Sequence, residues 1–278
     1  MAINLAVKFM PFVDETFSQD SKKSLVTNND FDWSGANSVK IYKITTAQMT
    51  DYDRNGTGTS ASRYGDVSGL DAVTEELTIS KDRSFTFAID KLDSDETVSQ
   101  LQAASALERQ IREVVIPEID NYVYQTMAEN AGTKPAALTL DPDNIYSEIL
   151  KASQALDNAN APETERVLIV SPETYALMKK SPEIIVESEI GADMRAKGVI
   201  GMLDGASIVK VPANRLPENF GFILAHPSAT VAPSKLEDYK IHEDPPGISG
   251  SLVEGRVSYD AFVLDNKAKA IYYQEVSD

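Results

Sequence analysis

The sequence predicts a mixed α+β fold, in which one long helix separates a strand-rich segment from a segment of alternating helices and strands. Three observations support this class. An apolar stripe at helical spacing runs through residues 96–131, and residues 39–46 and 74–89 have the composition of strands. Helices and strands then alternate from residue 138 onward. With 278 residues, the chain is long enough for one or two domains with a buried core.

The N-terminal residues 1–37 show little periodicity and are interpreted as an extended arm. Such a segment alone cannot bury enough apolar surface to become ordered. We therefore expect its large apolar side chains to dock on another copy of the chain or on the body of the same chain. The predicted contact residues in the arm are Phe12, Phe17, Phe31 and Trp33.

Residues 38–92 predict an extended hairpin and its base. The two strand-like segments flank residues 51–69, which are rich in Gly, Ser, Thr and Asp. A structureless loop of this length is unusual inside a compact domain, so we expect it to project onto a neighbouring copy. The predicted contact residues here are Arg63, Tyr64, Lys81 and Arg83.

Residues 93–137 predict a long helix and the segment that follows it. Asp93, Ser94 and Asp95 are candidate N-caps, and Gly132 is a candidate end. Because Pro117 lacks a backbone N–H, we expect a kink or a local break near residues 115–117. Arg109 and Arg112 on this helix are further predicted contact residues.

Residues 138–234 predict a sheet flanked by helices, and residues 235–278 predict further strands. Asp141 and Pro142 are expected to begin one helix, and Ser171 and Pro172 another that continues through Met178. The expected strands of the sheet are residues 166–170, 208–211 and 220–225.

The charge and composition argue against several functional classes. The chain has 26 basic and 43 acidic residues, and its formal charge of −17 is the wrong sign for a nucleic-acid reader. It has no Cys, so it has no disulfide and no cysteine nucleophile. No apolar run approaches the roughly eighteen residues of a membrane span, and residues 1–11 do not resemble a signal peptide.

Motifs for metal binding and catalysis are weak, and we expect neither a cofactor nor a metal. Residues 51–56 read DYDRNG, the opening of a calcium loop, but Ser62 replaces the bidentate Glu at the twelfth position. The two histidines, His226 and His242, do not have metal-ligand spacing. An α/β hydrolase-like enzyme is disfavoured because the chain has no nucleophile-elbow motif.

Several segments resemble tailed-phage major capsid proteins. The matching C-terminal segments are FGFILAHPSA at 220–229, YKIHEDPPGISG at 239–250 and EGRVSYDAFVLDNKA at 254–268. Upstream, FDWSGANSVKIYKIT at 31–45 and DRSFTFAID at 82–90 resemble the hairpin base of these proteins, and VVIPEID at 114–120 resembles their spine helix.

The resemblance implies the Hong Kong 97-like capsid fold. Its parts would be an N-terminal arm (1–37), an extended hairpin and its base (38–92), a peripheral domain with a long spine helix (93–137), and an axial α/β domain (138–234). Residues 235–278 would supply the return strands of the peripheral domain and the final axial strand. An encapsulin-like bacterial nanocompartment shell has the same fold and is the nearest alternative.

The resemblance also implies partners. Copies of the chain would form the hexamers and pentamers of an icosahedral virion capsid, which assembles in the host cytoplasm and encloses double-stranded DNA without reading its sequence. A portal protein would occupy one vertex, and a decoration protein is a further candidate partner. Because the arm begins at Met1 and the hairpin at Ser38, a separate scaffolding protein is expected. No membrane partner is expected.

Overall fold

The computed structural model describes residues 21–28, 38–44, 47, 49–56, 62–66, 69, 72–92, 103–182, 184 and 199–277. The chain folds as two compact units. One is the hairpin unit, Trp33–Ile79, and the other is the main unit, which combines Met1–Asp32 with Ser80–Asp278.

The hairpin unit contains two paired strands, β1 (Ser38–Ile44) and β2 (Ala72–Thr78). They are antiparallel and in continuous register, from Ser38 opposite Thr78 to Ile44 opposite Ala72. Across the pair, Lys43 Nζ lies 3.0 Å from Glu75 Oε2, and both side chains are largely buried. The strand expected at residues 39–46 is therefore confirmed over Ser38–Ile44.

A three-stranded antiparallel sheet in the main unit has the order β3-β10-β9. Its strands are β3 (Lys81–Asp90), β9 (Ser234–Glu243) and β10 (Gly250–Tyr259). The expectation of one strand over residues 74–89 is wrong, because β2 ends at Thr78 and β3 begins at Lys81. The reason lies at Ser80, whose backbone N–H and hydroxyl both donate to Asp260 Oδ2, at 2.7 and 2.9 Å, instead of joining a ladder.

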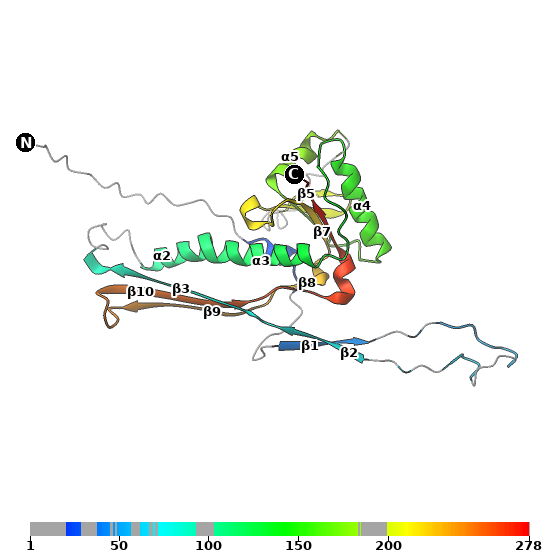
Figure 1. Cartoon of the computed structure of the whole chain (residues 1–278), viewed down its shortest axis with the longest axis horizontal. Helices are drawn as coiled ribbons and strands as arrows, with labels where there is room; N and C mark the ends of the chain where they lie inside the picture. The colour runs from blue at the N-terminus through cyan, green and yellow to red at the C-terminus, as the bar shows by residue number, and fades with distance from the viewer. Residues whose placement is uncertain are drawn as a thin grey trace, which may run out of the picture. The chain divides into compact units, whose positions relative to one another are not determined.

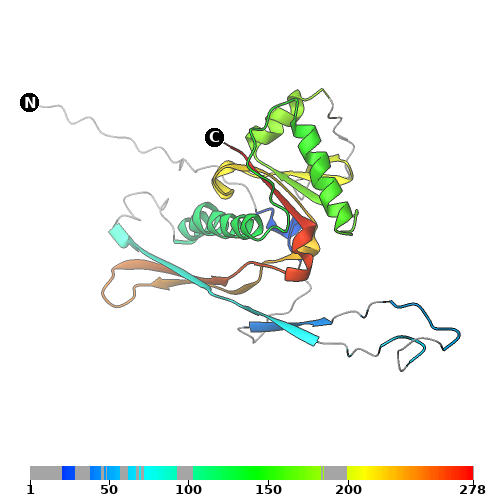
Figure 2. The same ribbon diagram turned by 45° about the vertical axis from the view of Figure 1, so that its right-hand side comes forward.

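One long helix runs beside this sheet in both views (Figures 1 and 2). It consists of α2 (Ala103–Gln110), a five-residue π-helical turn, η2 (Ile111–Val115), and α3 (Ile116–Glu129). Pro117 has no N–H for the carbonyl of Glu113, and its ring would clash with that carbonyl in a regular α-helix. The N–H of Ile116 instead reaches the carbonyl of Ile111, five residues earlier. The expected irregularity is therefore present, as a π turn immediately before the proline.

A five-stranded sheet forms the other half of the main unit, in the order β12-β7-β4-β6-β5. Strands β4 and β6 are parallel, and the other neighbouring pairs are antiparallel. The strands are β4 (Val167–Val170), β5 (Val199–Leu203), β6 (Ala206–Lys210), β7 (Phe220–Ala225) and β12 (Ile271–Glu275). β4, β6 and β7 confirm the strands expected at 166–170, 208–211 and 220–225, with shifts of one or two residues at their ends.

The five-stranded sheet is covered on both faces. On one face, Leu168, Phe222 and Leu224 pack with apolar residues of α4 (Ile145–Asn158) and with Met178 of α5 (Pro172–Lys180). On the other face, Ile169 and Ile223 pack with Val123 and Met127 of α3. Burial on both faces explains why β4 and β7 are apolar at nearly every position.

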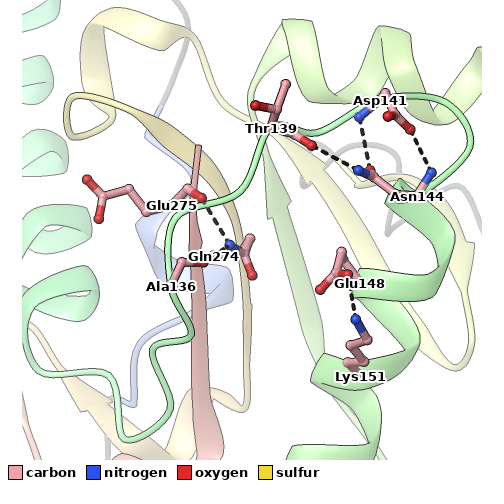
Figure 3. A network of polar contacts seen from close by, with 8 residues as sticks. All are labelled: Ala136, Thr139, Asp141, Asn144, Glu148, Lys151, Gln274 and Glu275. Carbon is pink, nitrogen blue, oxygen red and sulfur yellow. Dashed lines mark hydrogen bonds and ion pairs between the residues drawn. The ribbon is translucent and has the colours of Figure 1, made fainter. Parts of the chain in front are cut away.

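The two short helices begin differently. Ser171 caps α5 by accepting a hydrogen bond from the N–H of Thr174, as expected from Ser171 and Pro172, although the helix continues to Lys180. The expected start of α4 at Pro142 is wrong. Asp141 Oδ1 accepts from the N–H of Asp143 and from the N–H of Asn144, and Figure 3 shows the contacts between Asp141 and Asn144. This turn delays the helix until Ile145.

The remaining short elements connect these layers. They are η1 (Lys23–Leu25), η3 (Ala213–Arg215), η4 (Pro227–Ala229), β8 (Thr230–Val231), β11 (Phe262–Val263) and η5 (Asp265–Ala270). Strands β8 and β11 pair with each other. The N-terminal segment joins them, because Asn28 forms a parallel bridge with Val231.

Candidate assembly surfaces

The predicted contact residues fall into three groups in the structure. Phe12, Phe17, Phe31 and Trp33 lie outside the described residues. Arg63 and Tyr64 belong to the hairpin unit. Lys81, Arg83, Arg109 and Arg112 belong to the helix and sheet of the main unit.

The hairpin unit carries an exposed apolar surface, here called the hairpin patch, made of Met49, Tyr52 and Tyr64. Their relative exposures are 100%, 52% and 80%. The two tyrosine rings meet edge to face with centroids 5.0 Å apart. Hydrogen bonds across the hairpin support them, from Thr50 Oγ1 to the carbonyl of Tyr64 and from the N–H of Asp53 to the carbonyl of Arg63, each 2.9 Å long. The two tyrosines of this patch are therefore held together while they face solvent.

Among the described residues, the acidic side chains near the hairpin tip are not grouped as metal ligands. No three His, Asp or Glu side chains in the described part of the chain are grouped so that they would hold an ion. His242 on β9 instead lies 3.2 Å from Glu254 on β10. His226 caps η4, since its Nδ1 accepts from the N–H of Ser228.

The basic residues on β3 contact the long helix of their own chain. Arg83 Nε donates to Glu118 Oε1 at 2.7 Å, and the hydroxyl of Tyr259 donates to the same oxygen at 3.2 Å. Lys81 Nζ lies 5.0 Å from the centroid of the Tyr122 ring. These two cations contact α3 within the chain, and their role between subunits stays a prediction.

The two arginines of the helix also have partners within the chain. Arg112 pairs with Glu108 one turn earlier, at 2.6 Å, and both side chains are exposed. Arg109 is half-buried and likewise has a partner. An exposed pair of this kind contributes about 0.3 to 0.5 kcal/mol, so it orders the helix surface only weakly.

Asp260 links the start of β3, the long helix and the end of β10. Its Oδ1 accepts from the hydroxyl of Tyr122 and from the N–H of Ala261, each at 2.8 Å, and its Oδ2 accepts the two bonds from Ser80. The side chain is almost completely buried. Four hydrogen bonds to one buried carboxylate hold Ser80, Tyr122 and Ala261 together within the main unit.

The pKa values of two tyrosines beside Asp260 are raised well above the ordinary value for tyrosine. Burial raises the pKa of Tyr122 to about 12, with further contributions from the hydrogen bond to Asp260 and its charge. Burial, reinforced by the charge of Glu118, also raises the pKa of Tyr259 to about 12. Their rings meet edge to face at 5.7 Å. Both phenols therefore remain protonated donors at neutral pH.

A buried ion pair holds the N-terminal segment on the main unit. Arg215 donates to Asp120 Oδ2 at 3.0 Å, and both side chains are almost fully buried. The hydroxyl of Ser21 donates to Asp120 Oδ1 at 2.5 Å. Burial raises the pKa of the Asp120 carboxyl, against the opposing effects of Ser21 and Arg215. Residues 21–28 of the predicted arm thus dock on the chain's own body, through a polar contact that the sequence analysis did not anticipate.

A groove of about 610 Å³ lies at the start of α5, but its hydroxyl groups have structural roles. Ser171 caps the helix, and Thr174 Oγ1 donates to the carbonyl of Gly221 at 2.8 Å. Neither hydroxyl forms a hydrogen bond with a histidine or a carboxylate among the described residues. None of the described helices is long and apolar enough to cross a membrane.

Comparisons with known proteins agree with this architecture. The sequence model of a family described as phage capsid protein matches residues 72–273. A solved structure from Mycobacterium phage Che8 has a TM-score of 0.75 at 22% identity, covering 98% of this chain and 98% of that chain. The capsid structure of the cyanophage P-SCSP1u has a TM-score of 0.73 at 15% identity, covering 99% and 94%. The mature capsid of bacteriophage PhiM1 has a TM-score of 0.67 at 12% identity, covering 99% and 93%.

The search of curated proteins found no significant sequence match. At identities this low, the solved structures establish a shared fold, and the family match establishes membership. The predicted resemblance to tailed-phage major capsid proteins is confirmed, and the chain is a structural protein of the virion capsid. It belongs to the phage capsid protein family.

Proposed function

We propose that copies of this chain form the hexamers and pentamers of an icosahedral shell that encloses double-stranded DNA. The observation that carries this proposal is the hairpin patch. Met49, Tyr52 and Tyr64 are large apolar side chains on a unit separate from the main core, and all three face solvent. A grouped exposed apolar surface of this kind marks a protein interaction site. In a shell, a neighbouring copy would bury it.

The parts of the chain would have the roles that the Hong Kong 97-like fold gives them. Residues 1–37 would be the arm, and residues 38–92 the extended hairpin and its base. The long helix within 93–137 would be the spine of the peripheral domain, and 138–234 the axial domain. Residues 235–278 support this division, because they supply β9 and β10 to one sheet and β12 to the other.

Other partners follow from the same proposal. A separate scaffolding protein would guide assembly in the host cytoplasm, and a portal protein would occupy one vertex. The formal charge of −17 favours enclosed DNA that is repelled by the shell wall rather than gripped by it. A decoration protein is a further candidate partner for the outside of the shell.

Electron microscopy of the purified protein tests self-assembly directly, and a deletion in the hairpin tests the role of the hairpin in assembly. Removing residues 55–63 should leave a folded main unit, because these residues belong to the hairpin unit, but it should impair shell assembly. Circular dichroism and light scattering report the two properties separately. Normal shells from the deletion variant would contradict the proposed hairpin contact.

The nucleic-acid content of native particles separates a virus shell from an encapsulin-like compartment. Particles isolated from the native source should contain double-stranded DNA that resists nuclease until the shell is opened. Particles filled with an enzyme instead of DNA would favour the compartment.

A further inference from the structure

Two lysines from different parts of the chain lie over one aromatic ring, and a third lysine contacts the backbone of one of them. Lys179 Nζ lies 4.9 Å and Lys210 Nζ 5.5 Å from the ring centroid of Tyr175. Lys22 Nζ donates to the backbone carbonyl of Lys210 at 2.9 Å. These three residues, Lys22, Lys179 and Lys210, are here called the lysine patch.

The lysine patch has no internal counter-charge in the described part of the chain. None of its three ammonium groups forms an ion pair with a described carboxylate. The neighbouring Arg215 is already paired with Asp120. The pKa of Lys22 is lowered by burial and then by the charges of Lys210 and Arg215, as expected where cations are close together. An anion from outside the chain would relieve this repulsion.

The position of the lysine patch in the five-stranded sheet is well defined. Lys210 is the last residue of β6 and pairs with Val170, the last residue of the parallel strand β4. Helix α5, which carries Tyr175 and Lys179, begins two residues after that strand end. The lysine patch therefore lies on the side of the sheet where β4 and β6 have their carboxyl ends.

An acidic surface lies beyond the opposite end of the same strand. Glu163 and Glu165 precede β4, and both are exposed. Neither forms an ion pair with a described cation, while the nearby Arg166 is paired with Asp157. These two residues, Glu163 and Glu165, are here called the acidic end. The amino end of β4 thus presents unpaired negative charge, and the carboxyl end lies beside unpaired positive charge.

We propose that the lysine patch of one copy binds the acidic end of a second copy, in a head-to-tail contact that repeats around a ring. The proposal rests on the proposed self-assembly and specifies one of its interfaces. A contact between two different surfaces of the same chain is heterologous, and it closes into a ring when the rotation between copies divides a full turn. Hexamers and pentamers are rings of this type, so one pair of complementary surfaces serves both.

An acidic segment of protein fits the lysine patch better than DNA does. The chain as a whole carries −17, so a DNA molecule approaching three lysines would meet the repulsion of the remaining surface. A neighbouring copy, in contrast, brings the acidic surfaces that the composition makes abundant. Complementary charges at such a contact would fix the partner's orientation and speed its association.

Charge reversal tests the pairing. The first variant combines Lys179→Glu with Lys210→Glu, the second combines Glu163→Lys with Glu165→Lys, and the third carries all four changes. Each double variant should raise the protein concentration needed for assembly by about tenfold or more, because like charges would face each other. The fourfold variant should restore assembly, since the reversed charges again match. Light scattering measures assembly, and electron microscopy identifies closed shells.

Matched controls separate this contact from general charge effects. Lys91→Glu with Lys134→Glu changes the net charge by the same amount at residues outside the lysine patch, and it should assemble much more readily than the lysine-patch variant. Lys179→Gln with Lys210→Gln is a milder version for use if the reversal fails to fold. It should also weaken assembly, but less.

Four results would overturn the proposal. A fourfold variant as defective as either double variant would show that the two surfaces do not meet. A lysine-patch variant with a lower melting temperature and unchanged assembly would show that the counter-charge lies within the chain. Equal defects in the lysine-patch variant and the matched control would show a net-charge effect. Binding of a labelled DNA duplex that is lost in the lysine-patch variant would identify DNA as the partner. Wild-type protein that forms no shell at all would instead contradict the proposed function.

Discussion

The ring of Phe85 on β3 lies against Gly255 on β10. The two residues are direct partners in the antiparallel register, and a Cβ at Gly255 would lie 2.3 Å from Cζ of the ring. Tyr239 on β9 pairs with Gly255 from the other side, and its ring stacks on Phe85 with centroids 6.2 Å apart. The glycine thus provides the space in which aromatic rings from both outer strands meet across the central strand.

Replacing Gly255 with Ala should destabilise the main unit. The added methyl group would displace the Phe85 ring, and overpacking of this kind costs about 1 to 3 kcal/mol. Thermal unfolding should show a melting temperature lower by roughly 2 to 4 °C for each kcal/mol. Gly69→Ala is a suitable control, because nothing lies within 4 Å of a Cβ at that position. Equal melting temperatures for Gly255→Ala and the wild type would show that the ring moves aside without cost.

Removing one partner of the buried pair Arg215 and Asp120 should destabilise the main unit more than Gly255→Ala does. Arg215→Ala leaves a buried carboxylate that keeps the hydrogen bond from the hydroxyl of Ser21 but loses its cationic partner, and breaking such a pair costs about 3 to 5 kcal/mol. Denaturant unfolding measures this loss.

Replacing both partners, with Arg215→Met and Asp120→Leu, should recover most of the lost stability, because no buried charge then remains unpaired. Arg83→Ala is the matched comparison, since its pair with Glu118 is exposed and should contribute only about 0 to 1 kcal/mol. A double replacement no better than Arg215→Ala would argue against this account.

Alkaline pH should weaken the main unit through Tyr122 and Tyr259. Their folded pKa values are raised to about 12, above the unfolded value near 10. Between these values the unfolded chain loses phenolic protons that the folded chain keeps, so stability falls as pH rises from about 10 to about 12. Melting temperatures across this range should fall less steeply in Tyr122→Phe. An unchanged slope would mean that the pKa of Tyr122 in the folded chain is close to its value in the unfolded chain.

The hairpin patch should affect assembly without affecting the fold of the main unit. Tyr52→Ser with Tyr64→Ser removes two exposed rings that belong to the hairpin unit. Shell yield should fall, because burying an aromatic side chain at an interface contributes more than about 1 kcal/mol. Far-ultraviolet circular dichroism and the melting temperature of the main unit should stay unchanged. Full shell yield would exclude the patch from the interface.

Local signals in the sequence predicted much of the fold. Ser171 and Pro172 predict the start of α5, because a capping side chain and a proline act within one turn of the helix. The apolar run of β4 predicts a strand that is buried on both faces of the sheet. Pro117 marked the irregular turn of the long helix for the same local reason. At Asp141 two local signals competed, and the turn formed with Asn144 prevailed over the helix start.

The polar contacts of the site were not predictable in the same way. Asp120 and Arg215 are 95 residues apart in the chain, and Ser80 and Asp260 are 180 apart. Because the chain has 43 acidic residues, the sequence does not indicate which of them pairs with a given basic side chain. Arg83 was singled out as an interface cation, yet the fold brings Glu118 to it within the same chain. Only the tertiary fold decides which charges remain available to another copy.

The position of β12 has a consequence for synthesis. It follows every other strand of the five-stranded sheet in the chain, yet Ile271, Tyr272 and Gln274 are almost completely buried in that sheet. A ribosome delivers residues in order, so β7 keeps an open edge until residues 271–275 have emerged. Chains that stop earlier would expose this edge and lack part of the core. The fold itself would therefore exclude incomplete products from a growing shell.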